Sequence, residues 1–274
     1  MRPNRATAAS VTTTALALLL AVPGRAAFHI PGFGGPPKVD VALREVPAED
    51  LWQVRYHLPE KAAGVDLVHG RGSYRRTGWS VLPAGSQWVD APEVERLCFP
   101  APTRDFAVSF RTDVASRPKD YEVNVAMSDG GRLLYTGHLA VRPLERCGAG
   151  ADAQPAGEPP AHRFAFTTSA GRTIRVGDRA GDGALRWEAP LGSEQTYVYF
   201  GPQPGVVGER MVLIADPALP TWVRGDLEAT VARLFDRFAG ETGLSLPARP
   251  LVLLAFDPHG SGRSFDGGVL GEGA

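Results

Sequence analysis

The segment MVLIADPALPTWVRGDLEATVARLFDRFAGETG, residues 211 to 243, decides the fold class of the chain. It opens with an apolar run, Met211 to Ala215, and then takes on the period of an amphipathic helix, which we expect over about Pro217 to Thr242. The apolar residues of that helix are spaced by four, three and four positions: Leu227, Val231, Leu234 and Phe238. A second apolar run, Leu251 to Phe256, is typical of a strand covered on both faces. A strand, a helix and a strand in this order predict an α/β unit.

The residues before this unit follow a period of two. Apolar residues alternate with polar or small ones from Val39 to Leu43 and again from Trp52 to Leu58. Similar runs continue at Trp79–Leu82, Glu93–Phe99, Phe106–Arg111, Tyr121–Met127, Leu133–Val141, Phe164–Thr168, Thr173–Val176, Leu185–Glu188 and Thr196–Phe200. Such alternation indicates strands with one buried face, as in an antiparallel sheet packed on a second layer. We predict a mainly β chain, with an antiparallel β-sandwich over residues 28 to 203 and the start of an α/β domain with one long helix over residues 204 to 274.

Turn residues separate several of these runs. Ser128 to Gly131 predicts a hairpin turn, because Asp and Gly adopt the backbone conformations that tight turns need. Asp178 and Asp182 lie among glycines and suggest a calcium loop or a hairpin turn; the EF-hand spacing with its terminal Glu is absent, which favours the turn. The segment Gly148 to Ala161 has three prolines and no aromatic or β-branched residue, so we expect a flexible linker or loop there.

Residues 1 to 27 have the pattern of a signal peptide. Arg2 and Arg5 supply the positive charge, and Ala15 to Val22 form a short apolar core. Pro23 to Ala27 end in small residues suited to cleavage. We therefore expect export, to the periplasm or out of the cell. A membrane helix needs roughly 20 apolar residues, and no stretch of the chain reaches that length, so no membrane span is expected after cleavage.

Two cysteines, Cys98 and Cys147, are present. In an exported protein such a pair predicts a disulfide, and two separate buried thiols are the alternative. A loop of about 50 residues closed in this way contributes on the order of 4 kcal/mol in the chain-entropy model. Neither cysteine has a second ligand at the spacing of a zinc site, so we expect no metal role for them.

The charge balance gives no nucleic-acid footprint. Lys plus Arg number 29 and Asp plus Glu 30, and phosphate binding needs a clustered basic excess, so no nucleic-acid partner is expected. The one basic pair with aromatic company, Tyr74-Arg75-Arg76, is interpreted as a solvated turn.

A search for catalytic motifs finds none. There is no phosphate loop, no dinucleotide fingerprint and no nucleophile elbow in the sequence. The six histidines are scattered, without a His or carboxylate partner at the helical spacing of metal ligands: His29, His57, His69, His138, His162 and His259. We interpret each as a strand or loop residue. The chain as given is therefore predicted to hold no catalytic residue, metal ligand or cofactor, and to be inactive alone.

The order of elements nevertheless resembles a known family. A β-sandwich, a long helix, an apolar strand and the Gly-rich tail SFDGGVLGE, residues 264 to 272, are similar to the front half of the gluzincin metallopeptidases, namely the aminopeptidase N and glycyl aminopeptidase families. In that family a thermolysin-like catalytic domain follows the β domain, and a Gly-rich edge strand lines its substrate cleft. The resemblance implies a truncated chain, with Gly267, Gly268 and Glu272 as substrate-binding residues.

This chain departs from the family in two ways. The edge-strand signature of aminopeptidase N is G-A-M-E-N, whereas Gly268 to Glu272 reads G-V-L-G-E, so an exposed acidic residue in a flexible tail is the alternative for Glu272. The zinc motif H-E-x-x-H is absent. Zinc and a peptide or protein substrate are therefore expected only for a longer protein, in which metal-activated water attacks a peptide carbonyl.

Two further functions remain open from the sequence. One is a periplasmic or secreted, non-enzymatic β-sandwich binding module with an α/β appendage. The other is an exported hydrolase whose serine or paired carboxylates come from separate loops, since such groups are neighbours only in space. The substrate and the oligomeric state do not follow from the sequence.

Overall fold

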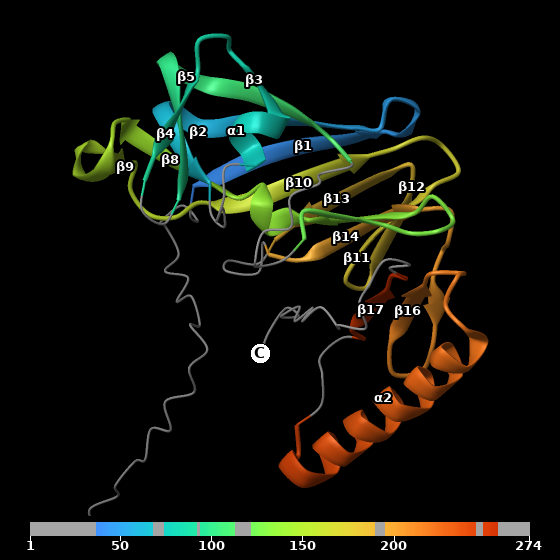
Figure 1. Cartoon of the computed structure of the whole chain (residues 1–274). Helices are drawn as coiled ribbons and strands as arrows, with labels where there is room; N and C mark the ends of the chain where they lie inside the picture. The colour runs from blue at the N-terminus through green and yellow to red at the C-terminus, as the bar shows by residue number, and fades with distance from the viewer. Residues whose placement is uncertain are drawn as a thin grey trace, which may run out of the picture. The chain divides into compact units, whose positions relative to one another are not determined.

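A computed structural model describes residues 37–67, 74–91, 94–112, 122–189, 195–244 and 249–256. The predicted signal peptide, residues 1 to 27, lies outside the described residues. The fold within these ranges is mainly β, with one long helix, as predicted (Figure 1). The domain boundaries at residues 27/28 and 203/204 remain predictions.

The largest sheet, called sheet A, carries the N-terminal alternation. Its strand order is β13 (Ala184–Glu188), β10 (Ala161–Thr167), β1 (Lys38–Val46), β2 (Leu51–Leu67), β5 (Glu95–Arg111) and β3 (Trp79–Leu82). Off this path, β4 (Gln87–Asp90) pairs with β5, β8 (Val141–Arg146) with β2, and β9 (Gln154–Pro155) with β8. The β1–β10 pair is parallel, whereas β1 and β2 are antiparallel.

A second sheet, sheet B, packs on the first. Its order is β12 (Arg179–Asp182), β11 (Thr173–Val176), β14 (Tyr197–Gly201), β7 (Arg132–Tyr135) and β6 (Asn124–Ala126). The Phe200 ring of sheet B lies 4.8 Å from the Trp52 ring and 5.9 Å from the Phe166 ring of sheet A, centroid to centroid. One apolar core thus joins both sheets, and the predicted β-sandwich is confirmed.

The decisive segment forms a third sheet, sheet C, and its helix. Sheet C has the order β15 (Val206–Val207), β16 (Val212–Ala215) and β17 (Leu251–Leu254), with β16 parallel to β17 and α2 (Thr221–Thr242) between them in the chain. The helix begins four residues later than the expected Pro217, because Pro220 is its N-cap, and it ends at Gly243, whose φ of 70° suits glycine. The predicted α/β unit is therefore present.

Two strand predictions need correction. The runs Glu93–Phe99 and Phe106–Arg111 belong to one continuous strand, β5. The run Leu133–Val141 is not one strand, because the 3₁₀ turn η2 (Thr136–His138) separates β7 from β8. The other short helices are α1 (Tyr74–Gly78), η1 (Pro47–Glu49) and η3 (Gly150–Asp152). The predicted loop Gly148 to Ala161 contains η3 and β9.

Both hairpin predictions are confirmed. The Met127 amide donates to the Gly131 carbonyl at 2.8 Å, which closes the turn between β6 and β7. Asp178 lies in the turn between β11 and β12, which pair antiparallel from Thr173↔Asp182 to Val176↔Arg179. The turn interpretation is therefore confirmed for Asp178, whereas Asp182 is the last residue of strand β12.

The prediction that Leu251 to Phe256 is covered on both faces is wrong. Every residue of β17 is half-buried, whereas every residue of β16 is buried. The difference follows from position, because β16 is the central strand of sheet C and β17 is at its end. The continuous apolar run therefore forms a strand at the end of sheet C, and the described residues cover this strand only in part.

Candidate functional site

The predicted substrate-binding residues Gly267, Gly268 and Glu272 lie outside the described residues. Within the described ranges, no group of three or more His, Cys, Asp or Glu side chains could hold a metal ion. One exposed pair on sheet A brings His57 Nδ1 to 2.8 Å from Asp105 Oδ1. These residues do not fit a zinc site, which needs three protein ligands for catalysis.

No helix within the described residues is long and apolar enough to cross a bilayer.

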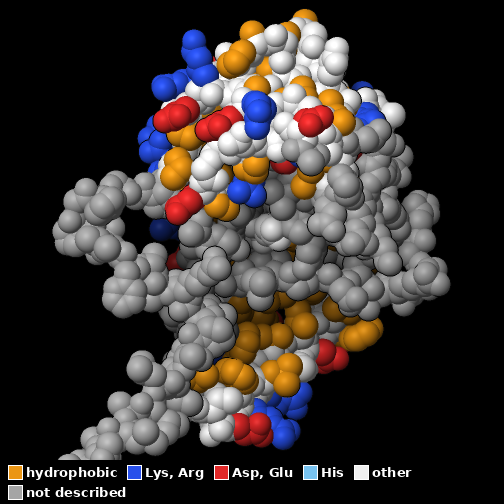
Figure 2. All heavy atoms as spheres, turned by 90° about the vertical axis from the view of Figure 1, so that its left-hand side faces the viewer, with side chains coloured by type: hydrophobic (Ala, Val, Ile, Leu, Met, Phe, Trp, Pro, Cys, Tyr) orange, Lys and Arg blue, Asp and Glu red, His pale blue; other side chains and the backbone are white. Residues whose placement is uncertain are grey.

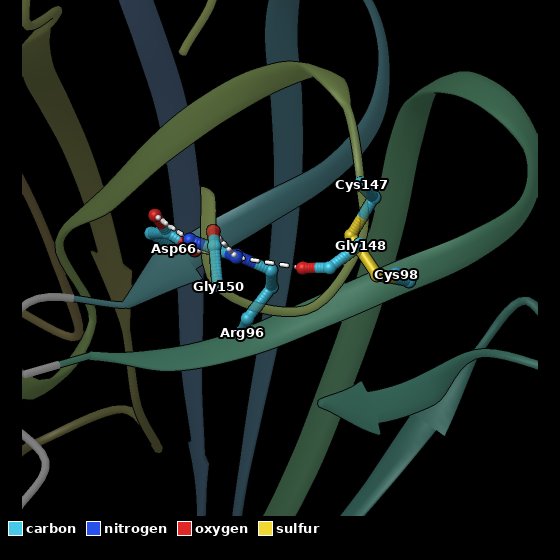
Figure 3. The surroundings of a disulfide bond; sticks show 6 residues. All are labelled: Asp66, Arg96, Cys98, Cys147, Gly148 and Gly150. Carbon is cyan, nitrogen blue, oxygen red and sulfur yellow. Dashed lines mark hydrogen bonds and ion pairs between the residues drawn. A yellow bond between two sulfur atoms is a disulfide. The ribbon is translucent and has the colours of Figure 1, made fainter. Parts of the chain in front are cut away.

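The predicted disulfide between Cys98 and Cys147 is confirmed, with 49 residues of separation and a Cα–Cα distance of 5.5 Å. Figure 3 shows that it closes a corner where the chain leaves β8. Gly64 lies directly beneath it, since a Cβ added there would meet Cys147 Sγ and the Leu97 carbonyl oxygen, each at 2.5 Å. The disulfide therefore requires glycine at position 64.

An arginine holds the same corner from the other side. Arg96 donates from Nε to Asp66 Oδ1 at 2.7 Å and from Nη2 to Oδ2 at 3.1 Å, a bidentate pair (Figure 3). Its Nη1 donates to the carbonyls of Gly148 at 2.7 Å and Gly150 at 3.3 Å. This fork orders the start of the segment that the sequence predicted as a loop, and its role is structural.

The most prominent polar centre of the sandwich surrounds Arg75. The interpretation of Tyr74-Arg75-Arg76 as a solvated turn is wrong, because the Arg75 side chain is 0% exposed. Its guanidinium donates to Glu95 Oε2 and lies 4.8 Å from the Tyr74 ring centroid and 5.2 Å from that of Trp79. The sequence gives no local signal for this burial, since Glu95 lies in another element, β5.

His138 completes this centre. Arg75 Nη2 lies 3.2 Å from His138 Nδ1 and donates to the His138 carbonyl at 3.0 Å, while the Tyr74 hydroxyl lies 2.6 Å from Nδ1. Because a guanidinium only donates, Nδ1 is the acceptor there. Burial raises the pKa of Glu95, although the charge and hydrogen bond of Arg75 lower it in part.

This centre cannot meet a substrate through the described residues. Its tyrosines, Tyr56 and Tyr74, both have pKa values raised far above the ordinary range by burial, so they stay neutral. Arg75 and His138 are 0% and 1% exposed. A buried ion pair such as Arg75–Glu95 fixes how the surrounding side chains pack, so we assign this centre a structural role.

A second sealed ion cluster joins sheets A and B at Glu45. This carboxylate, 2% exposed, accepts from Arg172 Nη2 at 3.1 Å and lies 3.6 Å from Arg132 Nε. Arg172 also donates to the Phe200 carbonyl at 3.2 Å, so β1 of sheet A is tied to β14 of sheet B. Glu45 interrupts the apolar inner face of β1, and its two arginines neutralise it.

A third polar centre lies at the carboxyl end of β16. Asp216 is 0% exposed and accepts hydrogen bonds from Ser128, Ala218 and Phe256. Burial alone would raise its pKa, but these hydrogen bonds together hold the pKa of Asp216 below its ordinary value of 3.8. Asp216 is not among the residues predicted as functional, although an acidic residue directly after a buried parallel strand is a recognisable signal.

Several large apolar side chains are exposed on α2. Trp222 is 67%, Leu234 58% and Phe238 50% exposed, and α2 has no buried residue. Figure 2 shows hydrophobic side chains gathered in the lower part of its view, at the level where Figure 1 draws α2. The predicted helical stripe is therefore present, but within the described residues it is covered only in part.

No protein-family model and no curated protein matches the chain. Among solved structures, an aminopeptidase N family protein from Idiomarina loihiensis is 9% identical, with a TM-score of 0.47 over 79% of this chain and 38% of its own. The M1 zinc metallopeptidase from Deinococcus radiodurans is 13% identical, with a TM-score of 0.34 over 80% of this chain and 55% of its own. Leukotriene A4 hydrolase from Saccharomyces cerevisiae is 11% identical, with a TM-score of 0.36 over 80% and 37%.

These solved structures are of the kind that the sequence resemblance named. The chain spans between 37% and 55% of the length of these proteins.

Proposed function

We propose that this chain is the β-sandwich and the first α/β unit of an exported zinc metallopeptidase of the aminopeptidase type. One observation carries the proposal: sheet C and its helix form an α/β unit whose apolar surfaces are covered only in part by the described residues. β17 is half-buried throughout and α2 exposes Leu234 and Phe238. A helix and sheet of this composition bury such surfaces against further elements, and the catalytic groups belong to those elements.

The zinc in this proposal belongs to the longer protein. The described residues offer no ligand set for it, so no chemical step through the metal is assigned to them. What this chain contributes is the binding of an extended peptide. In the proposal Gly267 and Gly268 leave backbone groups free to pair with a substrate strand, and Glu272 receives its amino end.

The proposal is tested on the protein encoded by the complete gene. Purified protein is assayed with aminoacyl p-nitroanilides, before and after dialysis against a chelator, and after addition of Zn²⁺. We expect hydrolysis that is lost on chelation and restored by zinc, and a Glu272→Gln variant with a raised KM. Hydrolysis that survives chelation points instead to a serine or carboxylate hydrolase. No hydrolysis of any peptide substrate contradicts the proposal.

A non-enzymatic binding module is the second candidate. It is favoured by the burial of Arg75, His138 and Glu45, because these polar centres of the described sandwich are closed to a substrate. It predicts a compact monomer in solution scattering, with no effect of zinc or chelator on any property of the protein.

Export is part of the proposal and has its own test. Mass spectrometry of the mature protein from its native host should show an N-terminus near Ala27. A retained Met1 in protein from the cytoplasmic fraction would overturn this part alone.

A further inference from the structure

We propose that Asp216 is a latch residue, which fixes the carboxyl ends of β16 and β17 to the Ser128–Gly131 turn of the sandwich. The inference stands on the described residues and does not depend on the proposed function. Asp216 is a positioning residue in this account, since its carboxylate is fully buried and is directed at protein donors.

The Asp216 carboxylate is surrounded by protein donors. Oδ2 accepts from the Ser128 amide at 2.9 Å and from the Phe256 amide at 3.3 Å. Oδ1 accepts from the Ala218 amide at 2.9 Å and from the Ser128 hydroxyl. A carboxylate has about four acceptor positions, and here four donors use them. Asp216 is therefore saturated by the protein and is not a ligand-binding group.

The donors to Asp216 come from both sheets B and C. Ser128 belongs to the turn between β6 and β7 of sheet B, whereas Ala218 follows β16 and Phe256 follows β17 of sheet C. One side chain thus joins three segments that are far apart in the sequence. Backbone pairing alone does not link sheets B and C, which are separate in the described topology.

The turn itself is built to hold its shape. Asp129 Oδ1 accepts from the Gly131 amide at 2.8 Å, and Asp129 Oδ2 accepts from Gln203 Nε2. The backbone N–H of Gln203 donates to the Tyr199 hydroxyl at 2.9 Å. Gly131 is required, because a Cβ there would meet both Asp129 Oδ1 and the Tyr199 ring at 2.9 Å. Asp216 therefore binds a turn of the sandwich that is held in place by its own hydrogen bonds.

The helix adds one contact to the same place. Arg224 of α2 donates from Nη2 to the Asp216 carbonyl at 3.5 Å. The start of α2 is thus held beside the carboxyl end of β16. In parallel α/β sheets, ligand-binding groups lie at the carboxyl ends of the strands. Asp216 is at that end of sheet C, and its hydrogen bond to the Phe256 amide fixes the chain where it leaves β17.

Amide hydrogen exchange tests the latch by comparing Asp216→Asn with the unaltered chain. Asn keeps the shape but loses one acceptor oxygen and turns an NH₂ group toward backbone donors. We expect exchange of the residues at 127–131 and 249–256 to rise by at least about tenfold, while β1 and β2 in the core of sheet A change less than about twofold. Asp182→Asn is the matched control, since Asp182 accepts from a single exposed amide, that of Gly171.

Ser128→Ala keeps the test decisive if Asp216→Asn fails to fold. It removes the hydroxyl donor and leaves the three amide donors, so we expect a smaller rise, about threefold, confined to the same two segments. An equal rise across β1 and β2 would show that Asp216 contributes only to global stability. No rise in either variant would show that the junction is held by other contacts. Either outcome overturns the proposal.

Discussion

Gly64 shows how a single residue without a side chain decides local structure. Any Cβ at this position would meet the Cys147 sulfur and the Leu97 carbonyl at 2.5 Å. We expect Gly64→Ala to destabilise the protein by about 1 to 3 kcal/mol and to leave a measurable fraction of free thiol. Urea unfolding and thiol titration measure the two effects. Gly78→Ala is the control, because nothing lies within 4 Å of a Cβ there; equal stability of the two variants would contradict the account.

Arg75 is the residue whose removal should cost the sandwich most among the polar side chains discussed. Arg75→Met leaves Glu95 buried without its cation, and we expect a loss of about 3 to 5 kcal/mol in urea unfolding. Arg163→Met removes an exposed pair with Asp40 and should cost less than about 1 kcal/mol. The double variant Arg75→Met/Glu95→Leu should recover part of the loss, since no unpaired charge then remains. Similar losses for Arg75→Met and Arg163→Met would show that burial of the first pair has no energetic consequence.

At the scale of elements, the junction at the end of β16 predicts a pH dependence. The folded pKa of Asp216 lies below its ordinary 3.8 because its hydrogen bonds outweigh burial, so its contribution is present above pH 3.8 and is lost as the pH falls through the folded pKa. The charged group beside it is Arg224, whose Nη2 donates to the Asp216 carbonyl.

Urea unfolding of Asp216→Asn and of the unaltered chain at several pH values measures this dependence. At pH 7 we expect a difference of about 1 to 3 kcal/mol, which shrinks as the pH is lowered below about 4. Asp182→Asn controls for the loss of an exposed carboxylate. A difference that stays constant down to pH 2 would mean that the ionised form of Asp216 is not what stabilises the junction.

The elements also show what the sequence could and could not predict. β3 and β11 have the expected bounds, because alternation over four residues between turns has one simple interpretation. The turn η2 was missed, since Thr136 to His138 lie inside an apolar run and are held by distant partners such as Thr196. Arg75 was misread for the same reason: its partner Glu95 is a neighbour only in the folded chain. Of the candidate sites, the disulfide was predictable from two cysteines, whereas Asp216 depends on contacts with Ser128 and Phe256.

For the whole molecule, the uncovered face of α2 predicts behaviour in solution. We expect the isolated chain to self-associate at micromolar concentration, and Leu234→Glu/Phe238→Glu to reduce this association without changing the thermal unfolding of the sandwich. Light scattering measures the association. Ala229→Glu, at an exposed position on the opposite side of the helix from Leu234 and Phe238, is the control and should leave the association unchanged. A monomeric unaltered chain would favour the binding-module candidate.

The difference between the sandwich and sheet C bears on the choice between a peptidase and a binding module. The two sheets of the sandwich enclose one apolar core, and sheet C packs on sheet B through a smaller cluster that includes Leu133, Tyr199 and Ile214. Sheet C nevertheless has a half-buried end strand, and α2 exposes an apolar stripe. This contrast between the two parts is what the peptidase proposal explains, because the second part then belongs to a larger catalytic layer.

The coding sequence downstream of codon 274 tests the central proposal most directly. The account predicts an open reading frame that continues and encodes H-E-x-x-H, with a further glutamate ligand, within about a hundred codons, as this chemistry requires. A stop codon directly after codon 274, or a continuation without that motif or a recognisable remnant of it, would contradict the proposal that this chain belongs to a zinc metallopeptidase.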